Sequence, residues 1–222
     1  MMLKITCVIV FAVICSACAT TNIDEYRSTV EPLLLDSSEK LVVLGRRDAG
    51  HYETGVDFSD CVGRVLQSNS EMQVISELDF IDAFYPWFEP RIAPKSLSRL
   101  KRLLEEPELN NKLVELDVRY MVWIDGQTNT VDSSGSMGCS IGPGGAGCFG
   151  FSSWDDESSY EAIVWDLTSF KEKGRVNVDS EGTSYLVGVV IPVPFIARVQ
   201  NDACVGIGNQ IKAFFEVAVQ KQ

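Results

Sequence analysis

Apolar and polar positions along the chain form two kinds of pattern. Lys40 to Arg46 is a short apolar run rich in β-branched residues, which predicts a buried strand. Val118 to Ile124 is apolar at consecutive positions, as expected for a central strand covered on both faces. Leucines at helical spacing predict a helix over Lys95 to Glu106, and Pro107 opens another that ends near Leu116.

The same patterns predict a strand between the first helices. Phe58, Cys61, Val62 and Val65 recur at helical spacing, and the sequence offers Asp57 or Ser59 as the N-cap. Glu71 to Ile75 predicts a second strand. Ser76 followed by Asp79 resembles a capping box for a helix that runs through Phe84.

The second half of the chain predicts antiparallel sheet. Asp125-Gly126 is a turn signal after the central strand. We expect the strands, a turn and the closing helix in this order: Gln127 to Asp132, Tyr160 to Asp166, a turn at Ser169 to Gly174, Arg175 to Phe195, and a helix from about Asp202 to Val219. Pro192 and Pro194 indicate that the long strand ends at a sheet edge.

These elements define the predicted fold class. It is α/β (α+β): one domain over residues 39–222, with a mixed sheet, helices packed on that sheet, antiparallel strands in the C-terminal half and a closing C-terminal helix.

The N-terminal pattern is typical of a lipoprotein signal. Lys4 precedes an apolar run from Ile5 to Ile14, and Ser16 and Ala17 precede Cys18. We therefore expect residues 1–17 to be a signal peptide, Cys18 to be lipidated, with palmitate among the acyl chains, and residues 18–38 to be a tether. The apolar run is only about half of the roughly 20 residues that a transmembrane helix needs.

The residue after Cys18 predicts the membrane to which the lipoprotein is sorted. Asp at this position resembles an inner-membrane retention signal, and this chain has Ala19. We expect lipid anchoring in the outer membrane, on its periplasmic face. The chain has a net charge of -12, and loss of Lys4 with the signal makes it -13. Nucleic acid is excluded as a partner class, since affinity for phosphate backbones requires clustered Lys and Arg.

Four cysteines remain after this processing, and an even number in an oxidising periplasm predicts two disulfides. Cys139 and Cys148 bracket a glycine-rich loop, Ser140 to Gly147, whose flexibility lets its ends meet. Cys61 and Cys204 then pair, each from the apolar face of a helix. The alternative is free buried thiols. A metal site is not expected, because no Cys-x-x-Cys occurs and His51 is the sole histidine.

Candidate catalytic motifs fail on their context. Gly142 to Gly147 satisfies G-x-G-x-x-G, but more strand is expected after it, whereas a dinucleotide fingerprint opens a helix. No Gly-Lys-Ser/Thr follows it, which excludes a phosphate-binding P-loop. His51 lies in a polar loop, and no Gly-x-Ser-x-Gly accompanies it. We expect no catalytic, cofactor or metal residues and no enzyme activity.

Aromatic side chains give the candidate binding residues. Tyr85 to Arg91 contains two prolines and predicts a loop, whose aromatics either pack on the domain or form a docking patch. Trp154 adjoins the acidic run Asp155 to Glu157, an arrangement that sugar-binding sites also use. The candidate partner-binding residues are Trp87, Phe88, Arg91 and Trp154.

The layout resembles known envelope proteins. Leu41 to Leu44, the helix carrying Cys61, Val118 to Ile124, Tyr160 to Asp166 and the final helix together resemble the α/β domain of the curli-secretion lipoprotein and the amino-terminal domain of the Tol-Pal translocation protein. Within that layout the chain is similar to uncharacterised proteobacterial outer-membrane lipoproteins in three segments: Pro86 to Arg91, Gly142 to Gly145 and Ala197 to Gln200. This resemblance implies the fold and the address, and leaves the activity open.

A pore built by oligomerisation is not expected, because Ser184 to Ile191 is apolar on both faces and predicts a buried strand rather than an amphipathic hairpin. Two function hypotheses follow. The first is a non-catalytic, lipid-anchored envelope protein that supports a periplasmic or outer-membrane assembly and binds an envelope protein, with homo-oligomerisation left open. The alternative is an envelope carbohydrate binder or hydrolase that uses the loop Trp154 to Glu157.

Overall fold

The computed structural model describes residues 19–28, 31–47, 53–68, 72–89, 92–94, 96–143 and 145–219, with side chains except those of Leu97 and residues 216–219. Cys18, His51 and Arg91 lie outside the described residues.

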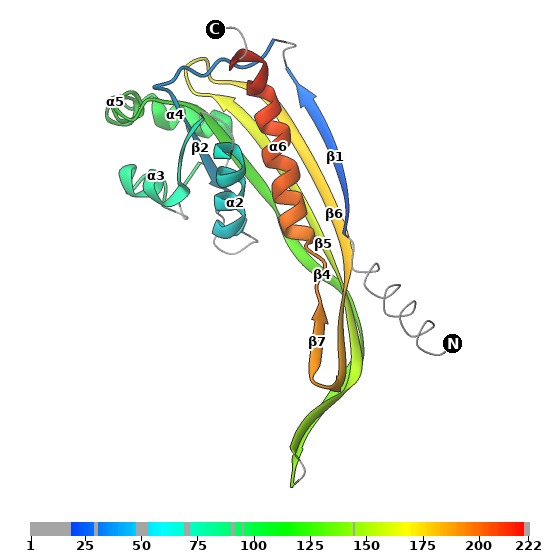
Figure 1. The fold of residues 1–222 in the computed structure, drawn as a ribbon. Coiled ribbons are helices and arrows are strands. Elements are labelled where there is room, and N and C mark those ends of the chain that lie inside the picture. Colours follow the sequence, from blue (N-terminus) through cyan, green and yellow to red (C-terminus); the bar gives the residue numbers. More distant parts are fainter. Residues whose placement is uncertain are drawn as a thin grey trace. The chain divides into compact units, whose positions relative to one another are not determined.

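The described residues form seven strands and five helices (Figure 1). In chain order these are β1 (Thr20–Arg27), β2 (Lys40–Gly45), α2 (Val56–Gln67), β3 (Gln73–Ile75), α3 (Glu77–Ala83), α4 (Leu97–Leu104), α5 (Pro107–Glu115), β4 (Val118–Gly142), β5 (Gly145–Asp166), β6 (Lys171–Val190), β7 (Pro192–Phe195) and α6 (Val199–Val219).

The strands form one mixed sheet. Its order is β1-β6-β5-β4-β2-β3, and β7 pairs with β6. β2 is parallel to both β3 and β4, whereas the connections from Gly142 to Gly145 and from Asp166 to Lys171 are so short that they join antiparallel neighbours. The predicted α/β class, with antiparallel strands in the C-terminal half and a closing helix, is confirmed.

Residue contacts divide the chain into two compact units. Unit 1 comprises Met1–Asn22, Thr128–Ser158 and Asp179–Asp202, and unit 2 comprises Ile23–Gln127, Ser159–Val178 and Ala203–Gln222. Strands β4, β5 and β6 contribute residues to both units. Each unit is described separately below.

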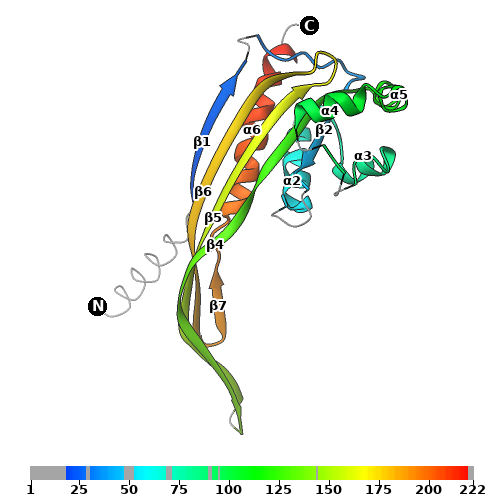
Figure 2. The same cartoon turned by 180° about the vertical axis from the view of Figure 1, so that it is seen from behind.

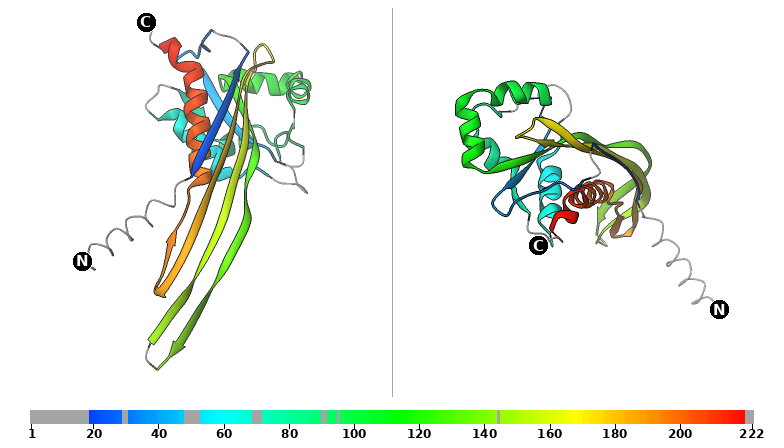
Figure 3. Two further views of the ribbon diagram at one scale, coloured as in Figure 1. Left: turned by 90° about the vertical axis from the view of Figure 1, so that its right-hand side faces the viewer. Right: turned by 90° about the horizontal axis from the view of Figure 1, so that it is seen from above.

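Unit 2 holds the apolar core, in two layers on the two faces of its part of the sheet. Alternate strand residues enter opposite layers, because successive side chains of a strand point to opposite faces. Val43 and Val122 pack with α2 and α6, while Val42 and Trp123 pack with the helices from α3 to α5. Figure 3 (right) shows α2 and α6 on one side of the sheet and α4 and α5 on the other. The consecutive apolar positions of the central strand therefore reflect burial on both faces.

Helix starts agree with the sequence at one site and differ at another. The Ser76 side chain caps α3 by accepting a hydrogen bond from the Asp79 amide at 3.2 Å, as predicted. The predicted cap of α2 by Asp57 or Ser59 is wrong, because α2 begins after Gly55 without a side-chain cap. The Ser59 hydroxyl instead donates to the carboxylate of Glu77.

The predicted turn at Asp125-Gly126 is also wrong, because β4 continues through it to Gly142. Gly126 has a φ of +152°, and a Cβ there would lie 2.2 Å from the Ser159 carbonyl oxygen. Only glycine lets the backbones approach so closely. The glycine therefore marks a close approach of two strands rather than a chain reversal.

The sheet begins earlier in the chain than expected. The expected tether, residues 18–38, contains β1, which forms an edge of the sheet next to β6. Within this segment Leu33 is also buried in the core, and its amide donates to the Phe214 carbonyl at 2.9 Å. The folded part thus includes residues that the sequence patterns assigned to the tether.

Candidate functional surface

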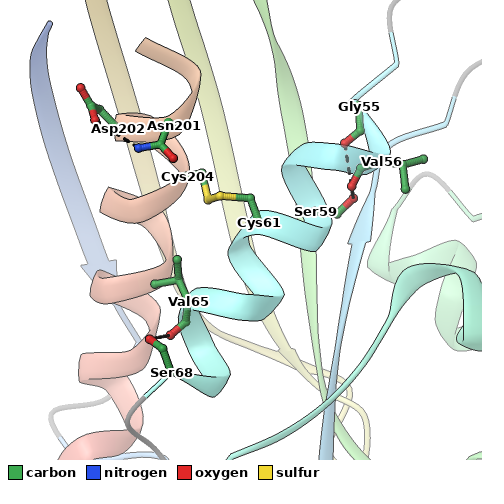
Figure 4. The surroundings of a disulfide bond; sticks show 9 residues. All are labelled: Gly55, Val56, Ser59, Cys61, Val65, Ser68, Asn201, Asp202 and Cys204. Carbon is green, nitrogen blue, oxygen red and sulfur yellow. Dashed lines mark hydrogen bonds between the residues drawn. A yellow bond between two sulfur atoms is a disulfide. The ribbon is translucent and has the colours of Figure 1, made fainter. Parts of the chain in front are cut away.

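Two disulfides tie the chain, with the pairing predicted from the sequence. Cys61 of α2 and Cys204 of α6 are bonded, with their Cα atoms 6.2 Å apart. Figure 4 shows this bond between the two neighbouring helices of unit 2. Because the bridge joins residues 143 positions apart, it fixes the closing helix to the first helix of the core. Its place inside the core makes its role structural.

Cys139 and Cys148 form the second disulfide, within unit 1. It links β4 to β5, and its Cα atoms are 4.0 Å apart. The predicted loop from Ser140 to Gly147 is shorter than expected, since β4 reaches Gly142 and β5 begins at Gly145. The bridge therefore holds two paired strands next to their turn.

Unit 1 is dominated by a strand assembly that we call the ribbon. It consists of Thr128–Gly142 of β4, Gly145–Ser158 of β5, and residues 179–195, which hold the last part of β6, the bend at Ile191 and β7. Figure 3 (left) and Figure 2 show these strands running side by side. A Cβ added at Gly135 would lie 2.2 Å from the Phe151 carbonyl oxygen, and one at Gly150 would lie 2.3 Å from the Ser136 carbonyl oxygen. Glycines thus permit close pairing of β4 and β5.

The ends of the ribbon carry no charge. No Asp, Glu, Lys, Arg or His occurs from Ser133 to Trp154 or from Thr183 to Ala197. The chain as a whole is 23% charged, so two uncharged segments of this length are a local departure from its composition. Such depletion is typical of the central part of a protein interface.

Large apolar side chains are exposed in these uncharged segments. The exposed fraction is 89% for Ile141, 74% for Ile191, 71% for Val189 and 61% for Phe149. The sequence predicted that Ser184 to Ile191 is a buried strand, and this is wrong for Val189 to Ile191, which are exposed. Exposed apolar groups that gather in one place, unlike scattered ones, mark interaction sites.

Other apolar and aromatic side chains of the ribbon share one of its faces. Tyr185 lies opposite Phe195 and Val187 lies opposite Val193 in the antiparallel pairing of β6 with β7, and directly opposite residues point to the same side. The ring of Phe151 from β5 lies 5.9 Å from that of Tyr185. The face is therefore continuous across three strands.

The two edges of the ribbon differ. β4 pairs with β2 only as far as Ile124, and among the described residues no backbone hydrogen bond is found on the outer side of residues 129–142. This edge has no proline or lysine, and Asp132 is its one charged residue. β7, which carries Pro192 and Pro194, pairs with β6 and with no other described strand, as predicted for an edge. The predicted single strand from Arg175 to Phe195 is wrong, because β6 ends at Val190 and β7 runs antiparallel to it. The β4 edge lacks the usual features that prevent pairing with another strand.

Within the described residues 85–89 of the predicted aromatic patch, Tyr85 is exposed and Phe88 is buried. Phe88 is only 2% exposed and packs edge-to-face on Phe80 and Phe84, so its proposed contact with a partner is wrong. Its aromatic neighbours offer more apolar contact than solvent does. Trp87 is half-buried against the same core layer, with the Lys112 ammonium 5.8 Å from its ring centroid.

Trp154 and the acids after it lie in β5 rather than in a loop. Because successive strand residues point to opposite faces, Asp155 and Asp156 diverge. Asp156 accepts a hydrogen bond from the Thr130 hydroxyl at 2.6 Å. Trp154 is half-buried. The structure therefore does not gather these residues into one acidic and aromatic constellation.

The described residues offer neither a metal-binding cluster nor a membrane-spanning helix. No three or more His, Cys, Asp or Glu side chains among them are grouped so that they could hold a metal ion. None of the helices in the described part combines the length and the apolar character needed to cross a membrane.

No protein-family model and no curated protein matches this chain. Solved structures that resemble it include two dodecamers of PelC from Paraburkholderia phytofirmans. A substituted variant of PelC is 9% identical, with a TM-score of 0.46, over 87% of this chain and 99% of the PelC chain. The other PelC dodecamer is 9% identical, with a TM-score of 0.43, over 88% of this chain and 96% of that chain.

Proposed function

We propose that this protein is a non-catalytic, lipid-anchored envelope protein that binds a protein partner through the ribbon. The observation that carries the proposal is the coincidence of exposed apolar side chains and absent charge at the ends of the ribbon. Ile141, Phe149 and Ile191 illustrate it, each exposed by 61% or more and each within an uncharged segment. A soluble surface rarely keeps such a patch uncovered.

The energetics support a binding role. Burial of one large apolar side chain contributes roughly 1.5–3 kcal/mol. A partner that covers several of the exposed ribbon residues would therefore have a large apolar driving force, from which the loss of rotational and translational freedom is subtracted.

The free edge of β4 indicates how the partner is oriented. An extended strand of the partner can pair with the outer backbone groups of residues 129–142, while the apolar side chains of the ribbon fix its register. Gly138 presents no side chain on this strand, and a Cβ added there would have nothing within 4 Å. The Cys139–Cys148 disulfide would keep the strands of the ribbon in place before the partner binds.

The lipid anchor and the cellular location complete the proposal. Cys18 would carry the lipid and hold the protein at the periplasmic face of the outer membrane, as the signal pattern predicts. Two disulfides suit an oxidising compartment such as the periplasm.

The test is native gel electrophoresis of gently solubilised envelopes. The wild type is expected to migrate as a complex larger than the single chain. Phe149→Asp combined with Ile191→Asp places charge in the apolar surface and is expected to release the chain from the complex. Val114→Asp is the matched control, since Val114 is 70% exposed on α5, outside the ribbon. Equal migration of both variants as the wild-type complex would contradict the proposal.

A further inference from the structure

A second site follows from the parallel part of the sheet in unit 2. β2 lies between β3 and β4 and is parallel to both. The chain leaves β2 for α2, which packs on one face of the sheet, and leaves β3 for α3, which packs on the other. Adjacent parallel strands whose connections diverge in this way open a crevice at their carboxyl ends, where α/β proteins bind small ligands.

A cavity of about 420 Å³ lies at this crevice. That volume is in the range of small-molecule sites. Its wall combines polar residues of α2 with apolar residues of the strands, namely Asp57, Asp60, Arg64, Val43, Val74 and Ile75.

Glu77 forms a fixed part of this wall. It is 2% exposed, and one carboxylate oxygen accepts two hydrogen bonds from the Arg47 guanidinium, at 3.0 and 2.7 Å. The other oxygen accepts from the Ser59 hydroxyl. Because Arg47 already balances its charge, Glu77 supports the cavity and leaves the recognition of a ligand to other side chains.

Two carboxylates at the cavity have no such partner. Asp57 and Asp60 are three positions apart on α2 and so share a face of that helix. Neither carboxylate has a hydrogen bond or an ion pair with any residue in the described part of the chain, and neither does the guanidinium of Arg64, one turn further along. Asp60 is half-buried, so its charge is less well screened than that of a fully exposed group.

We infer that this crevice binds a cationic group on a short aliphatic stem, either an ammonium or a guanidinium. The charged end would lie between the carboxylates of Asp57 and Asp60, and the stem would contact Val74 and Ile75. Arg64 lines the same cavity one turn from Asp60, so the two carboxylates outnumber the cation by one charge. The shared chemistry fits a free small amine or a lysine or arginine side chain of a polypeptide, and it is independent of the ribbon.

The test is an NMR titration of the ¹⁵N-labelled mature protein with cadaverine, and separately with a capped tripeptide that contains one lysine. We expect saturable shifts of the amides of α2 and of residues 74–77. Binding of both probes would identify a side-chain ligand, whereas binding of cadaverine alone would identify a free amine. Butyrate, of opposite charge, is expected to cause no saturable shift.

The matched variants are Asp57→Asn with Asp60→Asn, and Glu105→Gln with Glu108→Gln, which changes the net charge equally on α4 and α5, away from the cavity. The first pair should weaken cadaverine binding at least about fivefold, since two exposed or half-exposed ion pairs are lost. The second pair should leave it unchanged. The inference is overturned if neither probe saturates, if butyrate binds instead, or if both pairs of substitutions weaken binding equally.

Discussion

The Cys61–Cys204 bridge gives the clearest stability prediction. The perturbation is Cys61→Ala with Cys204→Ala, which removes the bond between α2 and α6. The two residues are 143 positions apart, and in the chain-entropy model a loop of that length restricts the unfolded state by about 5 kcal/mol. This is a large share of the roughly 5–15 kcal/mol by which domains are stable.

The second disulfide supplies a matched comparison. Cys139 and Cys148 are 9 positions apart, and the same relation gives about 3 kcal/mol for such a short loop. This bridge lies in the ribbon, outside the core of unit 2. We therefore expect Cys139→Ala with Cys148→Ala to lower the free energy of unfolding of the core less than the loss of the Cys61–Cys204 bridge.

The assay is equilibrium urea unfolding of the mature protein at pH 7, followed by tryptophan fluorescence. The stacked Trp123–Trp165 pair, whose centroids are 5.7 Å apart in unit 2, reports the core. Loss of the long bridge should lower the free energy of unfolding by about 5 kcal/mol in urea, and should lower the melting temperature in a parallel thermal scan by about 10–20 °C for a chain of this size. A decrease in the free energy of unfolding below about 1 kcal/mol, or a larger effect of the short bridge, would refute the loop-closure reasoning.

Three further predictions concern single substitutions in unit 2. Burial raises the pKa of Asp166, but hydrogen bonds from Ser169 and Thr168 and the charge of Arg119 outweigh burial and hold the pKa below its usual value. Asp166→Asn should therefore be less stable than wild type in urea unfolding at neutral pH. The difference in stability should disappear as the pH falls through the lowered pKa. Burial raises the pKa of Glu77 against the opposing contributions of Ser59 and Arg47, so the folded state binds the proton of this carboxyl more strongly than the unfolded state does. Glu77→Gln should therefore gain stability relative to wild type as the pH rises above the ordinary glutamate pKa. A stability difference that stays constant across pH would contradict this prediction. Gly126→Ala should lower the free energy of unfolding by about 1–3 kcal/mol, because its φ is positive and its Cβ would meet the Ser159 carbonyl; unchanged stability on thermal unfolding would contradict the close approach.

The core could be predicted from the sequence because its signals are strong and local. Every residue from Val118 to Ile124 except Arg119 is apolar, which predicts burial on both faces of the strand. The structure buries this run between two helical layers. Ser76 and Asp79 have the three-residue spacing of a capping box, and the Ser76 side chain caps α3 by accepting from the Asp79 amide. The cysteine pairing followed from compartment and helical faces, and both bonds are present.

The ribbon could not be recognised in the same way. Glycine and serine favour turns and weaken strands, so Ser140 to Gly147 predicted a loop, while the structure continues β4 to Gly142 and uses glycines for close pairing of β4 and β5. The useful signal was the absence of charge from Ser133 to Trp154. β1 was missed because an exposed edge strand has little apolar periodicity, and most of its side chains face solvent.

The binding candidates of residues 85–91 show a different difficulty. An aromatic cluster between prolines has the same composition whether it packs inward or outward. Phe88 packs inward because Phe80 and Phe84 of the preceding segment form an aromatic cluster beside it. Tertiary contacts that the local pattern does not encode decided the outcome.

The central claim is that the ribbon contacts a protein partner in the envelope. The most direct measurement is photo-crosslinking in cells, with a photoreactive residue at Ile191 in the ribbon or at Val114 on α5, both highly exposed, followed by mass spectrometry of the products. The account predicts one reproducible protein adduct from Ile191 and none from Val114. Adducts that are equal from both positions, or no protein adduct from Ile191, would contradict it.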